Sequence, residues 1–119
     1  MTYTSFEREL VNWFIDHSVH SAVANQLRAA ALASREYTGA GLYLNLAVPD
    51  SALQLIAAVV ESPIDGPEIS SPMLKNGAGS LLFHKHGVIE FVEVYTYTDQ
   101  LSADPSEYSF SKRIVFPTT

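Results

Sequence analysis

The run Val88-Ile89-Glu90-Phe91-Val92-Glu93-Val94-Tyr95-Thr96-Tyr97-Thr98 decides the fold. Valine, isoleucine and aromatic residues, which are enriched in strands, occupy both of its alternating sides. A strand that is apolar on both sides belongs in the middle of a sheet, where both faces are covered. We therefore predict a central strand here, one face of which is formed by Ile89, Phe91, Glu93, Tyr95 and Tyr97.

The segments around this run predict further strands of the same sheet. Lys85-His86-Gly87 is a short loop that ends in glycine, so residues 80–84 are expected to form a hairpin with the central strand. Apolar and polar residues alternate over residues 42–48 and again over residues 108–116, which predicts two more half-buried strands.

Proline and glycine break the stretch between these strands. The prolines between residues 62 and 72 confine any strand there to a sheet edge, because proline cannot donate to a ladder. Residues 75–79, Lys-Asn-Gly-Ala-Gly, are expected to form a turn. Residues 51–61 fit either a helix capped by Asp50 or a buried strand, and periodicity does not decide between them.

Residues 1–36 are predicted to form a pair of helices. Thr4-x-x-Glu7 is a capping-box pattern. It stands directly before an apolar stripe at helical spacing, formed by Phe6, Leu10, Trp13 and Phe14. The alanine-rich run over residues 21–34 favours a second helix, because alanine has the highest intrinsic helix propensity.

These elements predict an α+β fold in a single domain that spans residues 1–119. The helical pair, residues 1–36, is expected to pack on one face of a mainly antiparallel sheet of four to six strands formed by residues 37–119. A chain of 119 residues and 13.1 kDa buries roughly two thirds of its unfolded surface on folding. That is enough for one hydrophobic core and too little for two.

The composition excludes several classes of function. The chain has no cysteine, which rules out disulfides, thiol nucleophiles and cysteine-ligated metal centres. A formal net charge of −6, without a cluster of basic residues, argues against nucleic acid as a partner. The apolar runs are too short for a membrane span and residues 1–4 do not begin a signal peptide, so a cytoplasmic protein is expected. No phosphate-loop, dinucleotide or hydrolase motif occurs, so no cofactor is predicted.

Glu93 is the first candidate for chemistry. Alternation places it among aromatic side chains on one face of the central strand. If that face is covered, the carboxylate is desolvated and needs a hydrogen-bonding or charged partner. The alternatives are a satisfied structural carboxylate, a residue on a face that is simply exposed, or a functional group. Glu93 is therefore the catalytic candidate, and Tyr43, Glu93 and Tyr95 are the candidate ligand-binding residues.

Acidic residues gather in the C-terminal part of the chain. Between Gly87 and Ser111 there are five acids and no lysine or arginine. One interpretation is a solvated loop edge. The other is a surface that attracts a basic protein partner. The residues of this candidate partner surface are Glu90, Asp99, Asp104 and Glu107.

Histidines suggest a weaker, metal-binding candidate formed by His84, His86 and Glu90. Imidazoles two residues apart on a strand face the same way and can share an ion. The spacing resembles the first motif of the cupins, but no histidine follows His86 to supply that family's second motif. Alternatively, both histidines are solvated residues near the hairpin loop. His17 and His20 lie three apart in a helical region, without an acidic residue at a further helical step, and predict no site.

The β-rich half resembles a group of short bacterial hypothetical proteins. The shared features are an Asn-Gly-Ala-Gly turn (residues 76–79), a hairpin, and a glutamate followed by an aromatic-Thr-Tyr ending (residues 93–97). Thr38-Gly39-Ala40-Gly41-Leu42-Tyr43 is similar to their earlier strand that opens with glycine. This chain has Asp99-Gln100-Leu101 where the group has tryptophan and proline. The group has no assigned activity, so the resemblance implies a fold and no chemistry.

Two functional hypotheses fit this sequence. The first is a small non-enzymatic protein-interaction domain, similar to an immunity protein or an antitoxin, whose acidic surface binds a basic protein. The alternative is a small-molecule or metal-dependent enzyme, or a ligand-binding protein, centred on Glu93. A homodimer through an open sheet edge is compatible with either, because unpaired edges invite pairing.

Overall fold

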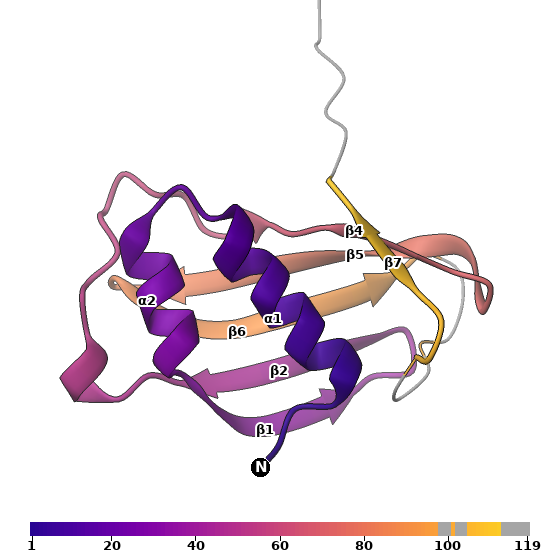
Figure 1. Cartoon of the computed structure of the whole chain (residues 1–119), viewed down its shortest axis with the longest axis horizontal. Helices are drawn as coiled ribbons and strands as arrows, with labels where there is room; N and C mark the ends of the chain where they lie inside the picture. Colours follow the sequence, from indigo (N-terminus) through magenta and orange to yellow (C-terminus); the bar gives the residue numbers. More distant parts are fainter. Residues whose placement is uncertain (98–100, 102–104, 113–119) are drawn as a thin grey trace, which may run out of the picture.

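The run that begins at Val88 forms the central strand of the sheet, as predicted (Figure 1). The computed structural model describes residues 1–97, 101 and 105–112 of the chain. The strand order is β1-β2-β6-β5-β4-β7 with antiparallel neighbours, and β3 pairs with β5 outside this path. This 7-stranded sheet is larger than the predicted four to six strands. Its strands are β1 (Ala31–Tyr37), β2 (Gly41–Ala47), β3 (Ile64–Asp65), β4 (Glu68–Ser71), β5 (Leu74–Lys85), β6 (Val88–Thr96) and β7 (Ser109–Ser111).

Two helices, α1 (Ser5–His17) and α2 (Ser21–Ala29), cover one face of the sheet, which confirms the α+β fold (Figure 1). The predicted capping box starts α1. The Glu7 N–H donates to the Thr4 hydroxyl at 3.2 Å, and the Thr4 N–H donates to the Glu7 carboxylate at 2.8 Å. Among the described residues, no helix is long and apolar enough to span a membrane.

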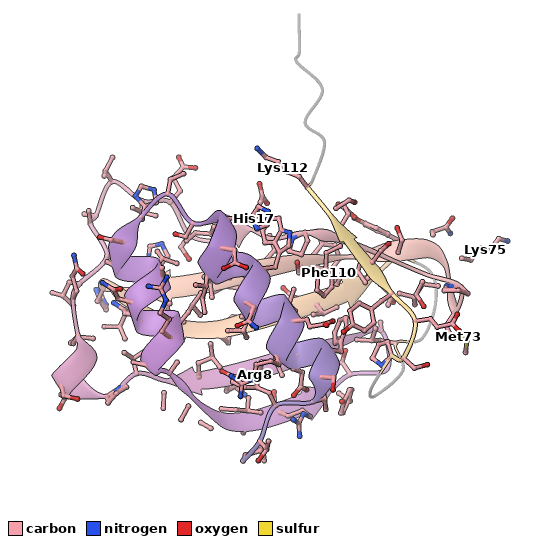
Figure 2. The ribbon with its side chains drawn as sticks, viewed as in Figure 1. Arg8, His17, Met73, Lys75, Phe110 and Lys112 are labelled. Carbon is pink, nitrogen blue, oxygen red and sulfur yellow. The ribbon has the colours of Figure 1, made fainter. Side chains whose placement is uncertain are left out.

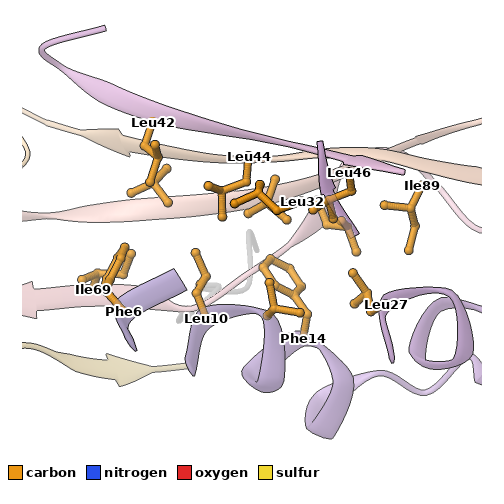
Figure 3. Close-up of a cluster of buried hydrophobic side chains, with 14 of the residues drawn as sticks. Phe6, Leu10, Phe14, Leu27, Leu32, Leu42, Leu44, Leu46, Ile69 and Ile89 are labelled. Carbon is orange, nitrogen blue, oxygen red and sulfur yellow. The ribbon is translucent and has the colours of Figure 1, made fainter. Parts of the chain in front are cut away.

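The helices and the sheet enclose one hydrophobic core (Figure 3). Phe6, Leu10 and Phe14 of α1 face the sheet and are at most 3% exposed. Alternate residues of the three middle strands meet them, and the largest of these that are fully buried are Leu42, Leu44, Leu82, Val92 and Val94. Full burial of each such side chain stabilises the fold by roughly 1.5–3 kcal/mol.

The predicted hairpin joins β5 to β6 through a turn of two residues. His86 and Gly87 both have positive φ values, 54° and 81°. Two successive residues with positive φ are typical of a type I′ turn, whose twist matches that of antiparallel strands. The turn is therefore tighter than the predicted loop over residues 85–87.

The prediction of helix up to residue 36 is wrong. α2 ends at Ala29, and residues 31–37 form β1, the edge strand beside β2. Helix propensity is a weak local preference that tertiary contacts override. Here pairing with β2 places Leu32 in the core, where it is 4% exposed.

The predicted turn over residues 75–79 and the predicted helix or strand over residues 51–61 are also wrong. Residues 75–79 lie within β5, and the chain reverses earlier, at Pro72 and Met73. Residues 51–61 form neither a full helix nor a strand. Only a short 3-10 helix, η1 (Asp50–Ala52), is present, and the irregular chain beyond it is anchored by Ile56, whose N–H donates to the Gly87 carbonyl at 2.9 Å. Of the predicted last strand, residues 113–116 lie outside the described residues.

The aromatic face of β6 points away from the helices. Val92 and Val94 project into the core, so Phe91, Glu93 and Tyr95 project from the opposite face of the sheet. A bulge opposite Phe83 and His84 shifts the register, so that Ile89 is 2% exposed and joins the core instead. Both faces of the central strand were expected to be covered, but the helices do not cover the face of Glu93, so that part of the prediction is wrong.

Candidate functional site

Three rows of paired residues build the sheet face that the helices leave uncovered. The middle row is Tyr43–Glu93–Leu81, with one residue each from β2, β6 and β5. The rows on either side are Asn45–Phe91–Phe83 and Gly41–Tyr95–Gly79. Because residues paired across strands share a face, Glu93 lies at the centre of an aromatic surface. We call the following residues the aromatic face: Tyr43, Leu81, Phe83, Phe91, Glu93 and Tyr95.

The Glu93 carboxylate is held by a tyrosine. The Tyr43 hydroxyl donates to Glu93 Oε2 at 3.1 Å, and both side chains are half-buried. This hydrogen bond, together with the negative charge of Glu93, raises the pKa of Tyr43 above its usual value. Tyr43 therefore stays a neutral donor, and it leaves the charge of Glu93 uncompensated.

Ring contacts hold the aromatic side chains in place. Phe83 stacks on Phe91 with ring centroids 4.5 Å apart, and Tyr43 meets Phe91 edge-on at 5.7 Å. Such pairs contribute about 0.5–1.5 kcal/mol beyond the area they bury. The rings thus form a pre-positioned surface rather than a set of independent side chains.

Two glycines make room beside Tyr95. A Cβ atom on Gly79 would lie 2.4 Å from the Cζ atom of Tyr95, so the ring lies directly over that glycine. Gly41 occupies the opposite flank, where a Cβ atom would lie 2.4 Å from the Val94 carbonyl oxygen. The two Gly-Ala-Gly segments of the sequence therefore each contribute their last glycine to the row of Tyr95.

A second tyrosine–glutamate pair lies at the outer end of the same strand. The Tyr97 hydroxyl contacts both carboxylate oxygens of Glu68, at 2.9 and 3.1 Å. Desolvation and this hydrogen bond raise the pKa of Tyr97 to about 12. Tyr97 meets Tyr95 edge-on at 5.7 Å and so extends the aromatic face toward β4.

The structure separates the acidic residues expected to bind a partner. Glu90 is exposed at the start of β6, whereas Glu107 is exposed just before β7. β7 lies beside the far end of β6, because it pairs with β4 next to the part of β5 that faces Thr96. The six residue-to-residue steps from Glu90 to Thr96 span roughly 20 Å at the rise of a strand. Asp99 and Asp104 lie outside the described residues.

The candidate metal residues do not converge. His84 Nε2 lies 3.0 Å from the Glu61 carbonyl oxygen, and His86 is in the turn. In the part of the chain that the structure describes, no group of three or more His, Asp or Glu side chains is placed to hold a metal ion.

One cavity lies at the end of α1, on the helix side of the molecule. It has a volume of about 550 Å³, and His17 and Lys112, which are labelled in Figure 2, are among the residues that line it. Trp13 and His20 also line it. His17 and His20, for which the sequence predicted no site, therefore line the same cavity. A further cavity, of about 460 Å³, adjoins the β5–β6 turn. Glu93 lines neither of them.

Sequence reasoning placed Tyr43, Glu93 and Tyr95 together, and the structure brings all three onto the aromatic face. The sequence analysis missed Leu81 and Phe83 as members of this surface. The hairpin signal was not sufficient, because a two-residue turn at residues 86 and 87 by itself places Leu82 opposite Phe91. The bulge shifts this register by one residue and so brings Phe83 opposite Phe91 and Leu81 opposite Glu93.

Comparisons with protein-family models, with curated proteins and with solved structures found no match to this chain.

Proposed function

We propose that this protein is a non-enzymatic protein-interaction domain that binds a basic protein through its aromatic face. A protein that neutralises a basic toxin, as immunity proteins and antitoxins do, would be one such domain. The observation that carries the proposal is the cluster of half-buried rings around a carboxylate whose partner among the described residues is a neutral hydroxyl, on a sheet face that no described helix covers.

The aromatic face has the composition of an interface centre. Tyrosine and phenylalanine are enriched in such centres, and tyrosine is among the residues that contribute most to binding energy. Ring contacts already fix Phe83, Phe91 and Tyr43, so little side-chain entropy is lost when a partner binds. A partner that covers these rings buries their apolar surface, which favours binding, while little side-chain entropy is lost.

Charge favours a basic partner. The chain has a formal net charge of −6, and within the described residues the partner of the Glu93 carboxylate is the neutral Tyr43 hydroxyl. A positive surface would be steered toward this face, whereas nucleic acid would be repelled. A second copy of this chain, related by a twofold axis, would bring two Glu93 carboxylates together.

The sheet edges are poor alternatives to the face. β1 contains a bulge between Leu32 and Ser34, and β3 and β7 are only 2 and 3 residues long. Bulges and short strands are the usual protection of edges against pairing with another chain. Pairing of edges in a homodimer is therefore disfavoured relative to docking on the face.

Binding is favoured over catalysis at Glu93. An enzyme site needs a cavity that holds a substrate and excludes water. Glu93 instead stands on an open surface, outside both cavities described above.

The experiment is site-specific cross-linking in extracts of the native host. A photoreactive phenylalanine analogue replaces Phe83 on the aromatic face, or Val19 on the helix side as a control. We expect one basic protein to cross-link from position 83 only. When the domain and that protein are purified and mixed, Phe91→Lys in the domain should abolish their complex. Thermal unfolding of the variant domain should stay cooperative.

The opposite result separates the two surfaces. If Glu90→Lys combined with Asp104→Lys abolishes the complex and Phe91→Lys does not, the partner binds the acidic residues predicted from the sequence, and the aromatic face has no role.

The cavity beside α1 supports a second candidate function, the binding of a small apolar molecule. Its volume is in the range of ligand sites, and two lining valines, Val19 and Val59, are 88% and 84% exposed. Trp13, the one tryptophan of the chain, lines it and reports on occupancy. Anilinonaphthalene sulfonate should quench Trp13 fluorescence, and Val59→Lys should weaken this effect. Equal quenching in Val59→Lys and in the control Leu55→Lys would contradict this function.

A further inference from the structure

We infer that the centre of the aromatic face receives an arginine side chain of the partner, with its guanidinium paired to Glu93 and stacked on Tyr95. This inference rests on the proposed function and specifies the chemistry that the partner must present.

The carboxylate requires a cation from outside. Tyr43 donates to one oxygen of Glu93, and a carboxylate can accept further hydrogen bonds at both oxygens. The residues around it on the aromatic face are Tyr43, Leu81, Phe91 and Tyr95, and none of them is basic. An uncharged partner that covered this face would bury the charge of Glu93 without a counter-ion. The resulting desolvation free energy is offset only when a cation pairs with the carboxylate.

Tyr95 supplies a flat platform next to that charge. Its ring lies over Gly79, where the missing side chain lets it rest against the strand. Glu93 and Tyr95 are two residues apart on one face of β6, roughly 6.6 Å at the rise of a strand. One planar group can therefore stack on the ring and donate to the carboxylate at the same time.

These two requirements distinguish arginine from lysine. A guanidinium is planar, donates two parallel hydrogen bonds to a carboxylate and stacks on aromatic rings. An ammonium is a compact, strongly hydrated charge that satisfies the carboxylate but uses the platform less well. The geometry thus favours an arginine-bearing surface over one that is merely rich in lysine.

The test uses three capped nonapeptides of glycine and serine that differ only at the central residue, which is arginine, lysine or citrulline. Binding to the full chain is followed by shifts of the backbone amide resonances. The arginine peptide should shift residues 41–45, 79–83 and 91–95. The lysine peptide should bind about threefold more weakly, and citrulline, which lacks the charge, should not bind measurably.

Matched variants assign each half of the contact. Glu93→Gln keeps the shape of the side chain and should weaken binding of the arginine peptide about tenfold. Glu90→Gln, on the same strand but outside the aromatic face, should leave this binding unchanged. Tyr95→Leu should remove the preference for arginine over lysine, and Tyr95→Phe, which keeps the ring, should retain it.

The possible failures are distinguishable. If no peptide shifts the aromatic face, if lysine binds as well as arginine, or if Glu93→Gln binds as the unaltered chain does, the arginine inference is wrong. The proposed function would still stand if Phe91→Lys abolishes the partner complex. If Phe91→Lys leaves that complex intact, the proposed function itself is wrong. Concentration-dependent dimerisation that Phe91→Lys abolishes would instead identify a second copy as the occupant.

Discussion

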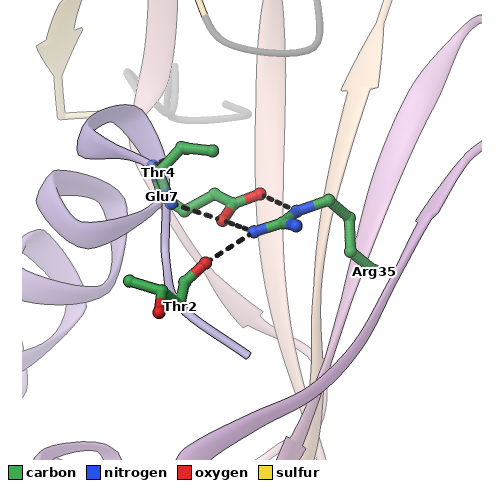
Figure 4. Close-up of polar contacts among 4 residues, drawn as sticks. All are labelled: Thr2, Thr4, Glu7 and Arg35. Carbon is green, nitrogen blue, oxygen red and sulfur yellow. Dashed lines mark hydrogen bonds and ion pairs between the residues drawn. The ribbon is translucent and has the colours of Figure 1, made fainter.

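Two glutamates, one on each face of the sheet, show how differently the two faces use a carboxylate. Glu7 on α1 is fully buried and accepts two hydrogen bonds from the Arg35 guanidinium, at 2.5 and 2.6 Å, and one from the Thr4 N–H (Figure 4). Glu93 on β6 is half-buried and accepts one hydrogen bond from Tyr43. The carboxylate on the covered face is paired with a cation, whereas among the described residues the carboxylate on the uncovered face is paired with a neutral hydroxyl.

The same contrast separates neighbouring residues of one strand. Leu82 of β5 is fully buried under the helices, while Phe83 projects from the aromatic face and is half-buried. Substitutions on the covered face should therefore change stability, and substitutions on the aromatic face should change binding.

The largest effect is expected from breaking the buried ion pair. Arg35→Ala leaves Glu7 charged and unpaired in the core, which should cost about 4 kcal/mol of unfolding free energy. The measurement is urea denaturation followed by the fluorescence of Trp13.

The control for this variant removes both charges. Glu7→Gln with Arg35→Met retains the capping geometry and the packing of the long side chain, so most of the lost stability should return. If the double variant is as unstable as Arg35→Ala, packing of Arg35 rather than its charge stabilises the fold.

The next effect compares the two neighbours in β5. Leu82→Ala should cost about 3 kcal/mol, because it opens a cavity in the core. Phe83→Ala should cost roughly 1 kcal/mol, the contribution of its stacking on Phe91, yet should weaken partner binding strongly. Equal losses of stability would mean that the aromatic face is covered in the folded protein.

A smaller effect is expected at a buried polar residue of the covered face. Gln26 is fully buried, donates to the carbonyl oxygens of Gln54 and Gly87 at 2.8 Å each, and accepts from the Ile89 N–H at 2.9 Å. Gln26→Ala leaves these three backbone groups without partners and should cost about 2 kcal/mol. The control is Asn25→Ala on the exposed side of α2, whose cost should stay below about 0.5 kcal/mol; similar losses in thermal unfolding would contradict this role of Gln26.

The central strand and α1 could be predicted because their signals are local. The alternating run of β6 and the capping box of α1 each lie within about a dozen residues. β1 could not be predicted in this way, because its sequence favours a helix and only pairing with β2 makes it a strand. For the same reason Arg35 was assigned to a helix, and its contact with Glu7, 28 residues away, was missed.

The sequence did not show which of the central strand's two sides meets the helices, and this was the decisive unknown. A strand that is apolar on both sides carries no direct sign of which side meets the helices. In the structure, the side that carries Val92 and Val94 meets the helices. The side that carries Glu93 and Tyr95, whose polar ends tolerate water, does not. That assignment removes the case for Glu93 as a catalytic group buried under the helices, and it motivates the proposal that Glu93 takes part in recognition.

The smallest effect concerns the tyrosine hydroxyl at the outer end of β6. Because the folded-state pKa of Tyr97 is raised from 10.0 to about 12, the folded protein holds this proton more tightly than the unfolded chain does. The stabilisation is therefore fully present below pH 10 and is lost as the pH rises toward 12. Its size is modest, because Tyr97 is 48% exposed and solvent screens its interaction with Glu68.

Absorbance of tyrosinate in the near ultraviolet measures this step directly. The folded chain should show one tyrosine that ionises near pH 12, and Tyr97→Phe should remove it. Glu68→Gln is the matched control: it removes the charge that opposes ionisation and should bring the transition back toward the ordinary range. Tyr43→Phe should leave the step near pH 12 unchanged, because Tyr43 pairs with Glu93 instead. If Glu68→Gln has no effect, desolvation alone holds the proton on Tyr97, and the outer pair belongs with the buried residues rather than with the aromatic face.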